Sequence, residues 1–132
     1  SVNGNIDTRY LVGSVIIDVE NGNIKGQNIY GPIQAFTSLG NIYIDIAFDY
    51  SILDYSVGLE TGIGNINIGL PKKFPVNIEA EISDDKTSST ISSDIPIQFK
   101  NVSETYASGS IEGGTIPINL FSGKGHIIIR EN

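Results

Sequence analysis

The apolar positions of this chain follow a nine-residue rhythm that glycine sets. Each of five evenly spaced glycines is followed two positions later by a β-branched aliphatic residue, in the pairs Gly4 and Ile6, Gly13 and Val15, Gly22 and Ile24, Gly31 and Ile33, and Gly40 and Ile42. Nine residues make one short strand and one tight turn, a unit too small to bury its own apolar face. The pattern therefore predicts short β-strands that become stable by stacking on one another.

A longer repeat, made of two unlike units of this kind, underlies the rhythm. Asparagine follows every second glycine, at Asn5, Asn23 and Asn41, whereas Ser14 and Pro32 occupy that place in the intervening units. Two strands and two turns per repeat are typical of one rung of a β-solenoid, in which equivalent residues of neighbouring rungs lie about 4.8 Å from each other. We therefore predict an all-β fold, a short single-stranded β-helix of stacked nine-residue half-turns with about 18 residues per rung.

Two interpretations of the asparagines stay open. They can form a ladder whose side-chain amides bond the next rung, or they can serve only as turn residues that tolerate a left-handed backbone. An antiparallel meander is the competing fold, because the Asn-Gly pairs at 3–4 and 21–22 are strong hairpin signals. A meander does not require asparagine to recur in every second unit, so the solenoid is favoured.

The rhythm breaks after Gly40, since the next Gly-Asn-Ile unit begins only at Gly64. Tyr55 occupies the glycine position of the half-turn before Gly64, which leaves about six extra residues between Phe48 and Asp54 for a bulge or a longer loop.

Alternation of apolar and polar residues is cleanest at 42–46, 66–68 and 76–82, and it predicts strands with one exposed face. The stretch from about 83 to 94 is polar and rich in Ser and Thr, which predicts an irregular loop. The glycine-punctuated pattern returns from 109 to 129.

Length and composition indicate one domain over residues 1–132. The 24 isoleucines favour strands, because β-branched side chains are stiff at χ1 and fit a pleated surface. The chain opens in the middle of a repeat, and Ser1 has the character of a cloning remnant. We therefore expect a fragment of a longer exported protein.

The formal net charge of −7 argues against a nucleic-acid partner, which needs a basic patch. It also disfavours binding to an anionic membrane surface. No apolar run approaches the roughly 20 residues that a membrane helix needs, so we expect no direct membrane insertion of this segment.

Three groups of short motifs resemble a known family. They are the recurring Gly-Asn-Ile unit, the segment from Gly64 to Pro71, and the closing segment from Gly123 to Ile129. Together they look like the adhesin or "toastrack" domain of bacterial envelope proteins, which is related to the auto-transporter adhesin head (GIN) domain. His126 departs from the Asn or Asp usual at its position. The resemblance implies a β-helix-like stack, a location in the cell envelope or outside the cell, and no catalytic residues.

Residues that could carry catalysis or bind a metal are sparse. A Ser-His-Asp triad would have to use His126, the one histidine, and no Gly-x-Ser-x-Gly elbow surrounds any serine. One histidine and no cysteine cannot make a zinc set. We interpret His126 as structural and expect no catalytic residue, no metal and no cofactor.

Clustered carboxylates raise the question of a calcium site or a glycan-cleaving site. Asp45, Asp49 and Asp54 lie close in the sequence, and Glu79 and Glu81 share one strand face. None matches an Asp-x-Asp-x-Asp-Gly spacing, and no aspartate recurs regularly through the successive nine-residue units. Solvated surface acids are the favoured interpretation.

Tyrosines are the remaining candidates. Tyr43 alternates with Ile42 and Ile44 and should face outward, where an exposed tyrosine suits contact with a sugar or a protein. Tyr43, Tyr50 and Tyr55 are our candidate surface contacts, with cross-strand cover of a sheet face as the alternative.

These observations predict a non-catalytic, adhesin-like interaction module that binds a protein or a glycan at the cell surface. The alternative is a self-assembling β-helix scaffold like the bactofilins, because open ends of a solenoid template further pairing. A carbohydrate-active β-helix enzyme is disfavoured, since the chain is short for that class and lacks an obvious acid pair.

Overall fold

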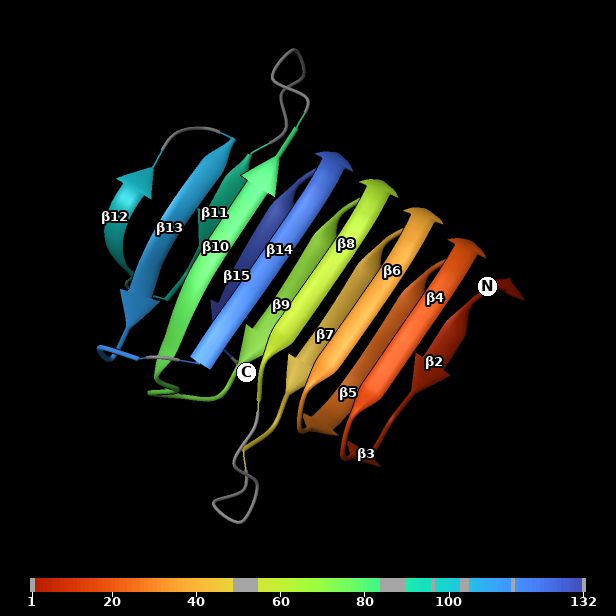
Figure 1. Ribbon diagram of the computed structural model, residues 1–132, viewed down its shortest axis with the longest axis horizontal. Helices are drawn as coiled ribbons and strands as arrows, with labels where there is room; N and C mark the ends of the chain where they lie inside the picture. The colour runs from red at the N-terminus through yellow and green to blue at the C-terminus, as the bar shows by residue number, and fades with distance from the viewer. Residues whose placement is uncertain are drawn as a thin grey trace.

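A computed structural model describes residues 2–48, 55–83, 90–95, 97–102, 105–114 and 116–131. These described residues contain no helix, and their strands form two mostly parallel sheets, which we call sheet A and sheet B. The sheets lie one behind the other along the length of the molecule (Figure 1). The predicted all-β class is therefore confirmed.

Sheet A has the spatial order β1-β4-β6-β8-β14-β10-β13-β12. Its strands in chain order are β1 (Val2–Asn3), β4 (Val15–Asn21), β6 (Ile33–Leu39), β8 (Val57–Ile63), β10 (Val76–Ile82), β12 (Gln98–Val102), β13 (Tyr106–Ile111) and β14 (Ile116–Lys124). Sheet B has the order β11-β15-β9-β7-β5-β2, and β3 also pairs with β5. Its strands are β2 (Ile6–Thr8), β3 (Leu11–Val12), β5 (Ile24–Tyr30), β7 (Ile42–Ile46), β9 (Ile66–Leu70), β11 (Ile91–Ser93) and β15 (Ile127–Glu131).

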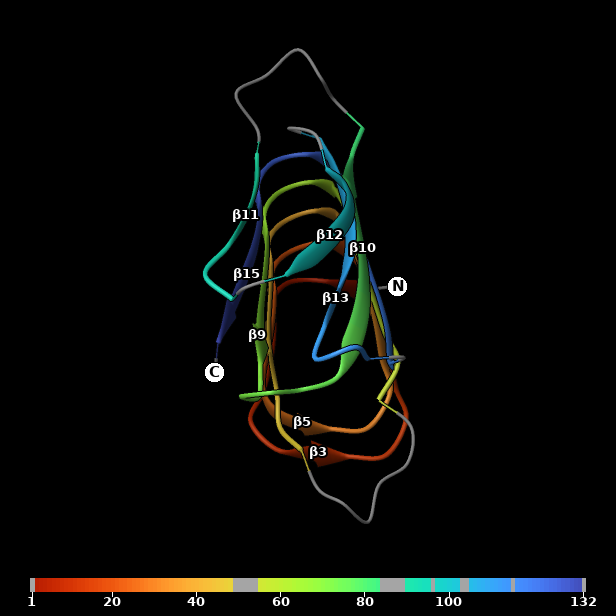
Figure 2. The same ribbon diagram turned by 90° about the vertical axis from the view of Figure 1, so that its left-hand side faces the viewer.

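Successive strands from β4 to β9 alternate between the two sheets, so the chain follows a flattened coil (Figure 2). Ile24 pairs in parallel with both Ile6 and Ile42, its equivalents one repeat before it and one repeat after it. Ile42 pairs in turn with Ile66, across the longer interval of the sequence. The extra residues thus fall between β7 and β8, where 49–54 lie outside the described residues. This register rules out an antiparallel meander for these strands and is consistent with a β-helix.

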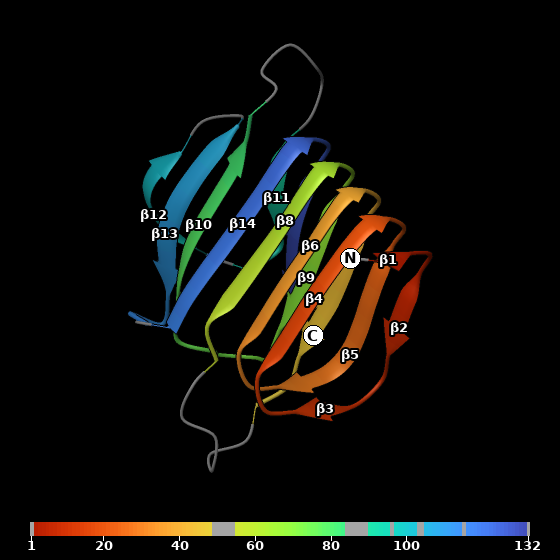
Figure 3. The same cartoon turned by 45° about the vertical axis from the view of Figure 1, so that its right-hand side comes forward.

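The order of strands in space departs from their order in the chain toward the C-terminus. Strand β14 lies between β8 and β10 (Figure 3), and β15 lies between β9 and β11 (Figure 1). The last rung is therefore inserted into the stack and not added to its end. Beyond it, β13 pairs antiparallel with β10 and β12.

The strand predictions at 42–46, 66–68 and 76–82 are confirmed by β7, β9 and β10. The irregular loop predicted at about 83–94 is wrong in part, because Ile91–Ser93 form β11 and pair with β15. Parallel pairing with an isoleucine strand satisfies this polar backbone, which composition alone could not indicate. Residues 84–89 lie outside the described residues.

The core lies between the sheets and consists of aliphatic columns. In sheet B one column runs through Ile24, Ile42, Ile66 and Ile127, all buried and in register from rung to rung. Full burial of each such side chain is worth about 1.5–3 kcal/mol. The same residue recurs because parallel stacking places equivalent positions in the same environment.

At three of the turns glycine is required because the backbone of the adjacent rung lies too close for any side chain. Gly40 has φ 151°, and a Cβ added to it would lie 1.9 Å from the carbonyl oxygen of Gly22 in the adjacent rung. Gly64 and Gly125 repeat this relation, with 1.9 and 2.0 Å to the glycine oxygen of the rung beside them.

The predicted asparagine ladder is confirmed next to these glycines. The side-chain oxygen Oδ1 of Asn5 accepts the backbone N–H of Asn23 at 2.9 Å, and Asn23 serves Asn41 in the same way at 2.8 Å. Asn41 Oδ1 accepts the backbone N–H of Asn65, and Asn65 Oδ1 accepts that of His126, both at 2.8 Å.

His126 continues the ladder in place of an asparagine. Its Nδ1 accepts the backbone N–H of Thr90 at 3.1 Å, the same bond to the next rung that each asparagine makes through Oδ1. The interpretation of His126 as a structural residue has a geometric basis, since an imidazole nitrogen can replace an amide oxygen as acceptor.

Buried hydroxyls hold the other side of the glycine turn. Thr61 Oγ1 donates to the carbonyl oxygen of Gly40 at 2.8 Å, and Ser122 Oγ donates to that of Gly64 at 2.9 Å. Both side chains are completely buried, and the bond offsets the cost of burying a hydroxyl.

Substitution of two glycines distinguishes the cost of backbone strain at positive φ from the cost of a steric clash with the adjacent rung. Gly13→Ala introduces a side chain at φ 105° with nothing within 4 Å, and we expect it to lower the free energy of unfolding by about 1–3 kcal/mol. Gly40→Ala adds the collision with Gly22, so we expect a loss of about 4 kcal/mol or more. Urea unfolding followed by circular dichroism measures both, and equal losses would contradict the role assigned to close backbone contact.

The ladder makes a second prediction at its last position. His126→Asn keeps an acceptor for the Thr90 N–H, and we expect thermal stability close to that of the parent chain. His126→Ala removes the acceptor and should lower the free energy of unfolding by about 1 kcal/mol. Calorimetric melting of the two variants side by side decides the matter, and equal stability of the two would sink this assignment.

Candidate interaction surface

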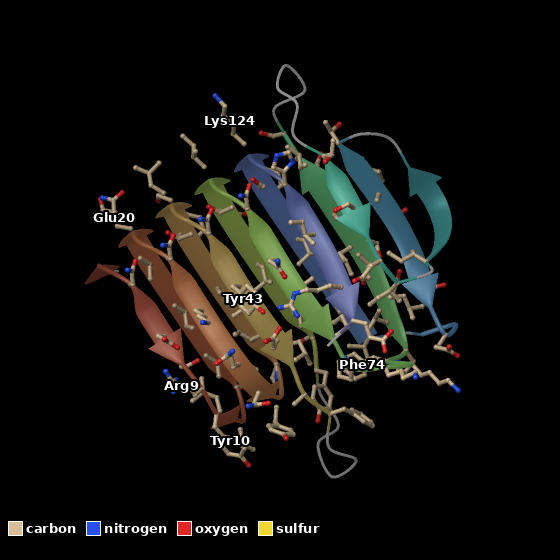
Figure 4. All side chains as sticks on the ribbon, turned by 180° about the vertical axis from the view of Figure 1, so that it is seen from behind. Arg9, Tyr10, Glu20, Tyr43, Phe74 and Lys124 are labelled. Atoms are coloured by element: carbon tan, nitrogen blue, oxygen red, sulfur yellow. The ribbon has the colours of Figure 1, made fainter. Side chains whose placement is uncertain are left out.

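Tyr43 faces outward from the middle of sheet B (Figure 4). Its ring lies between two cations, with Arg130 Cζ at 4.5 Å and Lys25 Nζ at 5.8 Å from the ring centroid. Both cations come from other strands of the same sheet, so the ring is half-covered by its own chain. Its role as a surface contact stays a prediction.

Tyr55 is a correction to the sequence prediction. Its side chain is only 2% exposed, and its ring centroid lies 5.4 Å from those of Phe48 and Phe74. The prediction that Tyr55 contacts a partner at the surface is wrong, because this aromatic cluster buries it just before β8 begins. Tyr50, the third candidate, lies outside the described residues.

The charges at the centre of sheet B neutralise one another. Arg130 on β15 forms an ion pair with Asp45 on β7 and also donates to Asn67 Oδ1 on β9. Gly69 lies between Asp45 and Arg130, and a Cβ there would come within 2.5 Å of the aspartate oxygen. Because Gly69 has no side chain, Asp45 and Arg130 can reach each other across β9.

The outer face of sheet A has a different character. One row across its strands alternates an acid with an aromatic ring, in the order Asp18, Phe36, Glu60, Phe121, Glu81 and Tyr106. The acids are exposed and the aromatic side chains are half-buried. We call these six residues the acid–aromatic row. Asp18, Glu60 and Glu81 form no ion pair or side-chain hydrogen bond with the described residues.

The adjoining row contains Gly58, which leaves the sheet surface hollowed on either side of it. One shallow depression of about 210 Å³ is lined by Gly58, Glu60, Glu79, Glu81, Asn119 and Phe121. A second of about 310 Å³ is lined by Ile16, Asp18, Gln34, Phe36, Gly58 and Glu60. Ile16 is 82% exposed, an unusual position for an isoleucine. These depressions make the face capable of holding an elongated ligand.

Sequence reasoning missed the acid–aromatic row. Its members come from six strands, and Phe121 lies between Glu60 and Glu81 only because β14 is inserted between β8 and β10. The alternation of apolar and polar residues indicated that each of these side chains points outward, but it did not indicate which of them are neighbours in the sheet. The sequence therefore indicates which residues are exposed on this face, but not how they are arranged across the strands.

Groups that could support catalysis do not converge elsewhere in the described residues. His126 belongs to the ladder, and Asp94 Oδ1 accepts the backbone N–H of Glu131 at 3.0 Å. Within the described ranges no group of three or more His, Cys, Asp and Glu side chains could hold a metal ion. The same residues include no helix long and apolar enough to cross a membrane.

Comparison with known proteins places the fold. No family model matches the chain, and no curated protein matches it. A solved structure from Clostridium sporogenes ATCC 15579, described as a "putative cell adhesion protein", matches with a TM-score of 0.69 and 22% sequence identity. The match covers 90% of this chain and 55% of that chain, so this chain corresponds to about half of that structure. At this identity the likeness shows a shared fold.

The sheet B cluster makes a prediction about stability. Asp45→Asn removes the charge that faces Arg130, and we expect the free energy of unfolding to fall by about 1.5–3 kcal/mol. Asp7→Asn on the exposed side of β2 is the matched control and should change stability little. Urea titration of both variants tests this, and a neutral Asp45→Asn would show that the pair contributes nothing to the fold.

Proposed function

We propose that the chain is a non-catalytic, adhesin-like interaction module of the toastrack type, built as a β-solenoid and displayed at the cell envelope or outside the cell. The acid–aromatic row of sheet A carries this proposal. This face is broad and has shallow depressions, and its carboxylates and aromatic rings are spread along it. Such a surface suits adhesion to an extended partner. They do not converge on one reacting atom, as general acid–base catalysis requires.

The fold neighbour supports the proposal, since it is described as a "putative cell adhesion protein". The glycine, asparagine and hydroxyl contacts that repeat from rung to rung also support it. They make the stack rigid, and a rigid sheet loses little conformational freedom when it binds.

A self-assembling scaffold is the second candidate, and one observation favours it. Tyr10 and Val12 are 68% and 59% exposed near the N-terminal edge, where β2 and β3 each pair on one side only. The opposite end differs, because the antiparallel strand β12 slants across the opening between the sheets (Figure 2). In a head-to-tail scaffold, the N-terminal edge of one chain would have to pair with the opposite end of the next chain, where β12 lies. Concentration-dependent growth in analytical ultracentrifugation would favour the scaffold.

The interaction function is tested by obstructing the face with a neutral side chain. A Cβ at Gly58 meets only Gln34 Cγ, at 3.7 Å, so Gly58→Gln can fill the hollow without disturbing the sheet. The probes are intact bacterial cells, isolated envelope fragments and immobilised glycans, titrated with fluorescently labelled chain. We expect saturable binding to one of them, weakened at least about tenfold by Gly58→Gln.

Ser92→Gln is the control, because it adds the same side chain to the exposed side of β11 in sheet B. It should leave binding unchanged. Equal loss in both variants, or no saturable binding to any probe, would refute the proposed function.

A further inference from the structure

We infer that the outer face of sheet A binds a basic, extended segment of another protein, in the polyproline II conformation with Lys or Arg at every third residue. The inference rests on the proposed function and names the partner class of that same face. Three observations carry it: the spacing of the acids, the sign of the charge over the six strands that carry the row, and the aromatic rings between the acids.

The spacing of the carboxylates is regular. Asp18, Glu60 and Glu81 lie on β4, β8 and β10, and each is separated from the next by one intervening strand. Two strand separations amount to about 9.6 Å. A polyproline II helix repeats every three residues, with an advance of about 9.3 Å per turn. A segment that runs across the strands can therefore present one cation to each acid in turn.

Over the six strands that carry the acid–aromatic row, the face is acidic. Among β4, β6, β8, β14, β10 and β13, which the structure describes in full, the outward acids are Asp18, Glu20, Glu60, Glu79 and Glu81. Lys124 is the sole Lys, Arg or His in these strands, and it stands at the very end of β14. Charge complementarity thus selects a cationic partner. On sheet B, by contrast, Arg130 already pairs with Asp45.

The aromatic side chains explain why the partner should also be apolar between its charges. Phe36 and Phe121 flank Glu60, and Phe121 and Tyr106 flank Glu81. Aromatic surfaces are what proline-rich segments dock on, and a Lys or Arg side chain gains cation–π attraction beside a ring. Tyr106 is further held by its hydroxyl, which lies 3.5 Å from Glu79 Oε1.

Two other ligands fit the same face less well. A divalent cation needs several oxygens at about 2.3–2.6 Å from one point, whereas successive acids of the row stand about 9.6 Å apart. A neutral glycan would use the rings but would gain no charge attraction from the carboxylates. Both remain outcomes of the test.

The experiment uses fluorescein-labelled synthetic peptides and the whole chain. One peptide repeats Pro-Pro-Lys, and the other has the same length and composition with its lysines grouped at one end. Fluorescence anisotropy is recorded at low ionic strength and at physiological salt. We expect the repeating peptide to bind several-fold more tightly, with an affinity that falls as salt rises.

Two charge variants locate the site. Glu60→Gln/Glu81→Gln should weaken binding of the repeating peptide about five- to tenfold. Asp7→Asn/Glu131→Gln removes the same charge from exposed positions of sheet B and should leave it unchanged. Circular dichroism melting confirms that both variants fold.

Equal binding of the two peptides, or equal loss in the two variants, would overturn the inference. So would binding of Ca²⁺ alone or of an immobilised neutral glycan with the same sensitivity to Gly58→Gln. The glycan result would leave the proposed function standing, whereas failure of every surface probe would refute that function independently of the peptides.

Discussion

The close approach of backbone to backbone at the glycine turns is the constraint on which the rest of the structure depends. At Gly40, Gly64 and Gly125 the rungs come so near that a single methyl group would overlap the carbonyl of the rung beside it. That approach places the asparagine oxygens and the threonine or serine hydroxyls within bonding distance of the next turn. It also brings the isoleucine columns into register, so packing and hydrogen bonding reinforce each other.

The repeating half of the fold could be predicted because stacking repeats the same environment, and the same environment selects the same residue. Gly22, Asn23 and Ile24 recur as Gly40, Asn41 and Ile42 for that reason. The C-terminal half could not be predicted in the same way. Nothing local in residues 116–131 shows that β14 and β15 enter the stack between earlier rungs, since that position depends on pairings with strands far away in the chain.

The residues of the candidate interaction surface are brought together by the same long-range pairings. Alternation indicated that Tyr43 points outward, but not that Arg130 would cover it from β15. Tyr55 occupies a glycine position of the repeat, but its ring packs in a cluster with Phe48 and Phe74, which the repeat did not indicate. The acid–aromatic row exists only once six strands are in order. A flat face assembled from distant positions leaves little trace in any short motif.

The inserted last rung has a consequence for how the chain reaches its folded state. During synthesis β8 and β9 emerge long before β14 and β15, the strands that will lie beside them. Until β14 and β15 leave the ribosome, the strands between which they insert have unpaired edges, and such edges invite pairing with other chains. The fold is therefore completed by strands that insert into its interior. A chain truncated after β13 would lack two central strands, β14 and β15, and not strands at the end of the sheets.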